Sequence, residues 1–109
     1  MLNPKDNELV SRVLASTRAG KRAWIPAGEA NVFATAMLGK YLVSIRGPFF
    51  VQGIGQTYFM DIRTDDGAKV LTLSSEDYPD LAELHELARR QALKVDDAID
   101  DILQDLGPE

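Results

Sequence analysis

The chain of 109 residues has no cysteine, one histidine and only 7% aromatic residues. Without cysteine it cannot form a disulfide framework, a Cys-type zinc site or a thiol nucleophile. With one histidine, any Ser-His-Asp triad would depend on His85. No apolar run approaches the ~20 residues of a membrane span, and the first residues lack a signal-peptide pattern. We therefore expect a cytoplasmic protein with no cofactor, no metal and no membrane contact.

The rest of the composition is that of an ordinary globular chain, with 45% hydrophobic and 27% charged residues. A mass of 12.0 kDa fits a single domain over residues 1–109. Surface scaling predicts that a folded chain of this size exposes ~6,000 Å² of the ~17,000 Å² that is accessible when it is unfolded. That burial supports one modest core.

Charge is unevenly distributed along the chain. Residues 1–75 carry nine basic and six acidic side chains, whereas residues 76–109 carry three basic and eleven acidic ones. The net charge of −5 argues against unaided binding along a nucleic-acid backbone, where Lys or Arg must neutralise phosphates. The acidic C-terminal third is either a solvated helix face or a charge-directed contact surface.

An N-terminal helix begins at Pro4. Asn3 can cap its first amides, Pro4 supplies a preset φ angle, and Asp6 lies near the positive helix end. Gly20 is the expected left-handed stop. Apolar residues and a threonine then recur at helical spacing and predict one core-facing stripe: Leu9, Val10, Val13, Leu14 and Thr17.

The middle of the chain predicts four short strands joined by tight turns. Their ranges are 31–38, 41–46, 56–63 and 68–73. Gly39 and Lys40 predict a two-residue hairpin turn. That turn pairs Leu38 with Tyr41, Ala36 with Val43 and Ala34 with Ile45. Apolar residues then fall on both faces of the hairpin, and either face could be the buried one.

Residues 47–56 contain three glycines and one proline, so we expect no regular strand throughout this segment. In the strand that follows, Tyr58, Met60 and Ile62 share one face, whereas Phe59 and Asp61 share the other. Short connections favour an antiparallel meander.

The C-terminal third predicts helix from Pro79 and Asp80 onward. Its apolar stripe has a period near 3.6: Leu81, Leu84, Ala88, Ala92, Val95, Ile99, Ile102 and Leu106. One continuous helix fits this stripe, but Asp96 could cap a second helix, and we favour two helices broken near Val95. The predicted fold is α+β: an N-terminal helix, a four-stranded antiparallel meander, and one or two C-terminal helices packed on one face of the sheet.

Several short motifs extend over nearly the whole chain. They are Thr17-x-x-Gly20-x-x-x-Trp24, then Phe33, then Tyr41-x-Val43-x-Ile45, Tyr58-x-x-Asp61 with Asp66-Gly67, and the leucine-rich tail from Leu81 to Leu106. Together they make the chain resemble a family of small uncharacterised bacterial α+β proteins of about 100 residues. The resemblance implies the same architecture and a bacterial origin. It implies no activity and transfers no functional residue.

Two sets of residues could support chemistry. His85 lies beside the apolar stripe, where a general base would need an acidic partner and a substrate pocket. Asp96 with Asp100, and Asp97 with Asp101, share helix faces and could hold a hard cation weakly. A calcium site needs six to eight oxygen ligands, and the EF-hand spacing is absent. We expect His85 to lie at the edge of the core and the chain not to be an enzyme.

A basic and aromatic cluster could bind nucleic acid. Its residues are Arg12, Arg18, Lys21, Arg22 and Trp24. Exposed beside a sheet, such residues could stack and neutralise single strands. The RNP-type signature is missing. The alternative is that Trp24 fills the junction between helix and sheet, with its ring N–H bonded to a carbonyl.

A third candidate is the glycine-rich segment around residues 47–55. It carries four large apolar residues where polar ones are usual: Phe49, Phe50, Val51 and Ile54. Either they fold onto the core or they form a patch that a partner covers. From these patterns we expect a non-enzymatic interaction or regulatory module that contacts a protein partner or a second copy. Nucleic-acid binding is the alternative.

Overall fold

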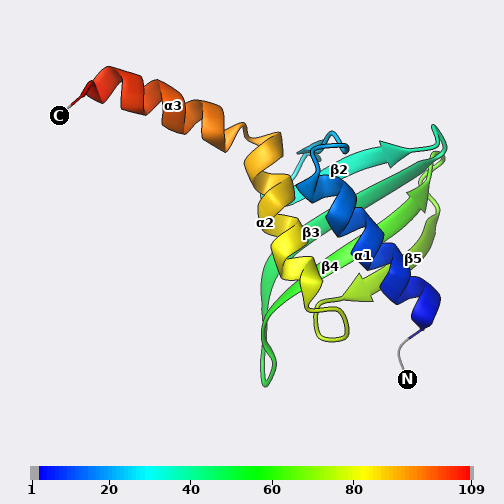
Figure 1. Cartoon of the computed structure of the whole chain (residues 1–109). Coiled ribbons are helices and arrows are strands. Elements are labelled where there is room, and N and C mark those ends of the chain that lie inside the picture. The colour runs from blue at the N-terminus through cyan, green and yellow to red at the C-terminus, as the bar shows by residue number, and fades with distance from the viewer. Residues whose placement is uncertain (1–2, 109) are drawn as a thin grey trace.

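A computed structural model of the chain describes residues 3–108, which form a five-stranded antiparallel sheet with three helices (Figure 1). The helices are α1 (Pro4–Arg18), α2 (Asp80–Ala92) and α3 (Val95–Leu106). The strands are β1 (Ile25–Pro26), β2 (Val32–Met37), β3 (Tyr41–Val51), β4 (Gly55–Thr64) and β5 (Lys69–Ser74). Strands pair in chain order, as a meander requires. The α+β prediction is confirmed, with the two-residue β1 as an additional edge strand.

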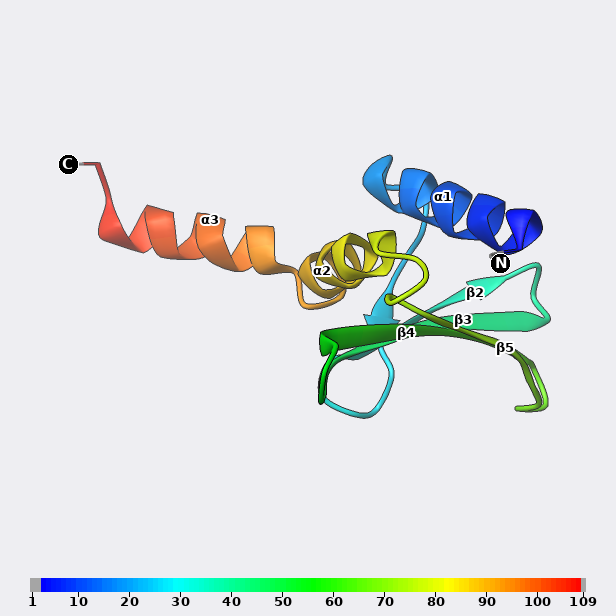
Figure 2. The same ribbon diagram turned by 90° about the horizontal axis from the view of Figure 1, so that it is seen from below.

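The helices α1 and α2 form a layer on one face of the sheet, and α3 continues beyond its edge (Figure 2). This projection makes the molecule long, with extents of 54 × 38 × 25 Å. Its radius of gyration is 15.5 Å, whereas a compact chain of this length has about 13 Å. None of the three helices within residues 3–108 is long and apolar enough to cross a membrane.

The residues at its two ends explain where α1 begins and ends, and they are the ones that the sequence predicted. The Asn3 side chain accepts hydrogen bonds from the amides of Lys5 and Asp6, and Pro4 opens the helix. Gly20 follows the end of the helix with φ at +72°. A residue without Cβ adopts that conformation at little cost.

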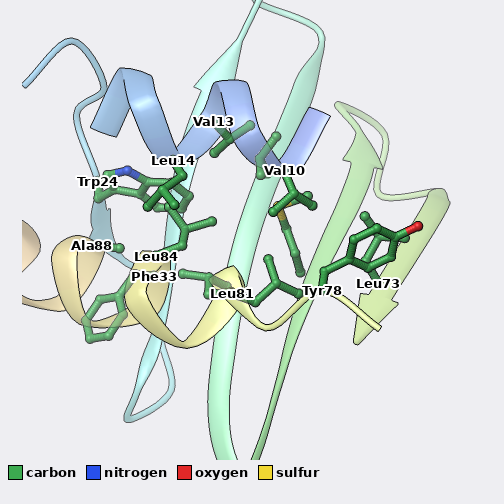
Figure 3. Close-up of a cluster of buried hydrophobic side chains, with 13 residues drawn as sticks. Val10, Val13, Leu14, Trp24, Phe33, Leu73, Tyr78, Leu81, Leu84 and Ala88 are labelled. Atoms are coloured by element: carbon green, nitrogen blue, oxygen red, sulfur yellow. The ribbon is translucent and has the colours of Figure 1, made fainter. Parts of the chain in front are cut away.

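The core lies between this helical layer and the sheet (Figure 3). Val10, Val13 and Leu14 of α1 face Leu81, Leu84 and Ala88 of α2. The sheet contributes Phe33, Val43, Ile45, Met60 and Leu73. Tyr58, Met60 and Ile62 share one side of β4, as predicted, and that side faces the helices.

The predicted register of the first hairpin is wrong by one residue. Met37 pairs with Tyr41, and Phe33 pairs with Ile45. The loop therefore contains three residues, and Leu38 and Gly39 both have positive φ angles. The shift places Phe33 and Val43 on the helix-facing side and leaves Ser44 and Arg46 on the opposite side, which we call the open face.

Residues 47–56 do not form one regular strand throughout, as expected, but most of them pair in strands on either side of a turn at 52–54. β3 continues through Gly47 and Pro48 to Val51 and pairs with β4 from Gly55 onward. Within the β3–β4 pairing, the register shifts only between Arg46 and Phe49. A bulge of this kind accommodates a proline and a glycine without ending the strand.

The two-helix interpretation of the C-terminal third is confirmed, and the break lies at Leu93-Lys94, just before Val95. Lys94 has a left-handed φ of 53°, which a continuous helix does not allow. Side chains of α2 are buried in the core, whereas none of the residues Val95–Leu106 is buried against the described part of the chain.

Candidate functional site

His85 is a core residue rather than an accessible base. Only 4% of its surface is exposed. Its Nε2 donates to the carbonyl oxygen of Asn31 at 2.9 Å, and its ring lies against Phe33 and Tyr58 with centroids 5.4 and 5.0 Å apart. A substrate would have to displace this packing to reach the imidazole. The arrangement gives His85 a structural role that links α2 to the sheet.

The predicted basic cluster does not form one binding surface. Trp24 is buried and donates its ring N–H to the hydroxyl of Thr17 at 3.0 Å. It therefore fills the junction of helix and sheet, although its acceptor is a hydroxyl and not the predicted carbonyl. Arg18 binds Glu83 of α2, and Arg12 pairs with Glu8.

The two remaining members of the cluster are placed differently. Arg22 is half-buried, and its Nε donates to Ser16, whereas Lys21 is exposed. With the indole buried, the cluster has lost its stacking side chain. Nucleic-acid binding stays a prediction, and no contact of these five residues supports it.

The segment with Phe49 and Phe50 forms the end of the β3–β4 hairpin, which extends past the helical layer (Figure 1). Phe50 is 81% exposed, Ile54 and Phe49 are also exposed, and Val51 is half-buried. Phe49 lies beside Phe59 and the Arg46 guanidinium on the open face, not against the helices. The segment therefore does not fold onto the core. It forms an exposed apolar patch, which was the second of the two alternatives.

The open face has a buried carboxylate at its centre, which the sequence did not single out. Asp61 is 2% exposed and accepts hydrogen bonds from Arg46 Nε at 2.8 Å and from the Thr72 hydroxyl at 2.7 Å. Burial alone would raise the pKa of Asp61, but these two hydrogen bonds and the charges of Arg46 and Lys69 lower that pKa below its usual value. Both carboxylate oxygens are therefore engaged, and the group joins β3, β4 and β5.

The lowered pKa of Asp61 predicts a pH dependence of stability. Because the folded-state pKa lies below the unfolded value of about 3.9, the network stabilises the fold above that pH and loses its effect as pH falls through the folded-state pKa. We expect Asp61→Asn to lower the free energy of unfolding by about 1.5–3 kcal/mol at pH 7. The difference from wild type should narrow below about pH 4. Urea unfolding across this pH range measures it.

The exposed Asp105→Asn is the matched control and should leave the stability unchanged. A gap between Asp61→Asn and wild type that is the same at pH 7 and at pH 3 contradicts the assignment.

The largest exposed apolar feature on a single helix belongs to α3. We call it the α3 stripe, and it consists of Val95, Ile99, Ile102, Leu103 and Leu106. All but Val95 are 42–72% exposed. Helical spacing places these residues within about 100° of arc. The sequence reveals this stripe by its period, but the same period predicts a core helix, so its exposure could not be read from the pattern.

The acidic side chains of α3 surround the stripe and form no metal site. Asp96 pairs with Arg90 at the end of α2. Among residues 3–108, no group of three or more His, Cys, Asp or Glu side chains is arranged to hold a metal ion. The carboxylates give the stripe a negatively charged border.

Comparisons with protein-family models, with curated proteins and with solved structures found no match to this chain. The family resemblance inferred from the sequence therefore stays a prediction. The function must be inferred from the surfaces of the molecule itself.

Proposed function

We propose that this chain is a non-enzymatic protein-interaction module whose main contact surface is the α3 stripe. The observation that carries the proposal is an amphipathic helix of which no apolar side chain is buried against residues 3–108. Amphipathic helices commonly bind partners by placing such side chains in an apolar groove. The buried state of His85 supports the non-enzymatic part of the proposal.

The length of α3 supports a binding role. It has 12 residues, and isolated helices shorter than about 12–15 residues are marginally stable in water. Most helices in proteins are stabilised by packing of the apolar side. A helix with this composition gains that packing only when another molecule covers it.

The total surface area supports the same interpretation. The chain exposes 7362 Å², against the ~6,000 Å² expected for a folded monomer of its size. The excess is larger than the ~800 Å² that each partner buries in a standard interface. The exposed tip of the β3–β4 hairpin, with Phe49, Phe50, Val51 and Ile54, is a second contact surface in this proposal. A cytoplasmic location and a bacterial origin, both expected from the sequence, also belong to it.

The test introduces a charge on each side of α3. In Ile102→Asp the charge lies in the α3 stripe, whereas in Gln104→Asp it lies about half a turn away on the polar side. Wild type and both variants are immobilised and exposed to a cell extract. Retained proteins are identified by mass spectrometry, purified and titrated.

We expect a partner that binds wild type and Gln104→Asp equally but Ile102→Asp at least ~100-fold more weakly, because docking would bury an unpaired carboxylate. A partner that binds all three chains alike would remove the α3 stripe from the function.

A further inference from the structure

Another apolar surface lies at the end of the molecule that is opposite α3. We call it the α1 groove. It is a depression of about 340 Å³ lined by Leu9, Met37, Leu38, Tyr41, Ile62 and Val70, with Val43 at its base. Leu38 is 85% and Val70 59% exposed. The groove lies on the helix-facing side of the sheet. There, α1 and α2 leave the ends of the β2–β3 and β4–β5 hairpins uncovered.

We propose that the α3 stripe of one chain docks in the α1 groove of a second copy. This inference rests on the proposed function and names its partner. The two surfaces are alike in chemistry: each presents branched apolar side chains, and each is unoccupied among residues 3–108. A helix placed in the groove would add a third helix beside α1 and extend the layer that already covers the sheet.

The same chain cannot make this contact. Only Leu93 and Lys94 separate α2 from α3, and α3 leaves the body at the end away from the hairpin ends (Figures 1 and 2). A helix of 12 residues is about 18 Å long. It would have to cross over α1 to reach Leu9. A second copy can place its α3 there without any change of fold.

Charge favours the groove over pairing between two α3 helices. α3 contains five aspartates and no basic residue, so a pair of such helices would bring together ten carboxylates, of which only Asp96 of each chain has a cationic partner, Arg90. The rim of the α1 groove is mixed. Lys5 and Arg12 lie one helical turn from Leu9, and Lys40 Nζ is 5.4 Å from the centre of the Tyr41 ring.

Glu8 and the Asp65–Asp66 turn lie near the same rim, so it is not strongly positive. It nevertheless offers cations to the α3 aspartates, which a second α3 cannot do. Like charges brought together at an interface select against the wrong partner. The residues 1–75, which supply most of the groove, have more basic than acidic side chains, whereas residues 76–109 have the reverse.

The α3 stripe and the α1 groove are different surfaces of one chain, so a single docked helix would leave one stripe and one groove of the pair uncovered. Two copies close the assembly when each α3 occupies the groove of the other. Such an exchange buries four surfaces. The excess exposed area noted above is of the size that a stable dimer removes from each chain.

The test disables each surface separately. Ile102→Asp alters the α3 stripe, and Leu38→Asp with Val70→Thr alters the α1 groove at exposed positions that the core does not need. Aspartate tolerates the left-handed conformation of residue 38. Ile25→Asp, at an apolar residue of β1 that is 60% exposed and belongs to none of the proposed contact surfaces, and Gln104→Asp are the matched controls. The readout is the solution mass by light scattering at two concentrations, with circular dichroism to verify folding.

We expect wild type and both controls to have a mass of at least twice 12.0 kDa at high concentration. Each surface variant alone should be monomeric, with a dissociation constant raised at least ~100-fold. A mixture of the two surface variants should recover one contact and form a complex, because each supplies the surface that the other lacks.

Three results overturn the inference. A groove variant that keeps the wild-type mass would mean that α3 binds elsewhere, and an Ile25→Asp variant that dissociates would mean that the effect of a new carboxylate is not specific to the two surfaces. A wild type that is monomeric at all concentrations excludes the second copy as partner. In that last case the proposed function survives if a different protein binds in a manner that Ile102→Asp abolishes.

Discussion

Phe33→Ala is expected to lower the free energy of unfolding by about 3–5 kcal/mol. Phe33 is 2% exposed and packs in the core on the helix-facing side of β2, against the ring of His85. Removing its ring loses the transfer free energy of the side chain and leaves a cavity that the surrounding strands cannot close. Urea or thermal unfolding, followed by circular dichroism, measures the change.

Phe50→Ala is the matched control, because it removes the same ring from a position that is 81% exposed. Its expected cost is within about 0.5 kcal/mol. Similar losses for the two variants would mean that the end of the β3–β4 hairpin packs on the body of the protein. That result would also remove the hairpin from the proposed contact surfaces.

The second large effect is expected at Gly47, in the bulge of β3. Gly47 has φ at +136°, and a Cβ at this position would lie 3.0 Å from the carbonyl oxygen of Thr57 and 2.9 Å from Cδ1 of Tyr58. One of these atoms is backbone in the paired strand, so the clash cannot be relieved by a rotamer change alone. Gly47→Ala should therefore destabilise the fold by about 3 kcal/mol, from backbone strain and overpacking together.

Gly53→Ala separates the two causes. Gly53 lies in the turn of the same hairpin at φ +86°, and nothing lies within 4 Å of its added Cβ. This variant pays only the conformational cost, about 1–2 kcal/mol. Equal unfolding midpoints for the two variants would contradict the close approach of β4 at Gly47.

The elements that the sequence predicted well are those whose signals are local. Asn3, Pro4 and Gly20 determine the limits of α1 through contacts within a few residues. The alternation along β4 likewise places Tyr58, Met60 and Ile62 on one side of the strand, as the structure has them. These signals hold because capping and strand alternation depend on the backbone conformation of the segment alone.

The sequence failed to predict the features of the sheet that depend on a residue distant in the chain or on an unusual backbone conformation. Leu38 adopts a positive φ that apolar residues seldom adopt, and this lengthens the turn and shifts the register of the first hairpin. β3 continues through Gly47 and Pro48 because β4 pairs on both sides of the bulge. β1 has two residues and exists only through its pairing with β2.

The candidate sites show the same division. The sequence identified Phe49 and Phe50 as unusual for a connection, but only the fold shows that they are exposed. It could not identify Asp61, because the partners of this carboxylate come from β3 and β5. Periodicity established that α3 is amphipathic, but no periodic pattern states whether the apolar side meets the chain itself or another molecule.

The left-handed Lys94 divides the chain into a part whose apolar residues are needed for folding and a helix, α3, whose apolar residues are not. The core residues before it are needed for folding, because α1, α2 and the sheet bury one another. No residue of Val95–Leu106 is buried in the described chain, so folding alone would allow polar substitutions at most of these positions with little loss of stability. If homologous proteins keep apolar side chains at these positions, selection for binding explains it, because folding does not require them.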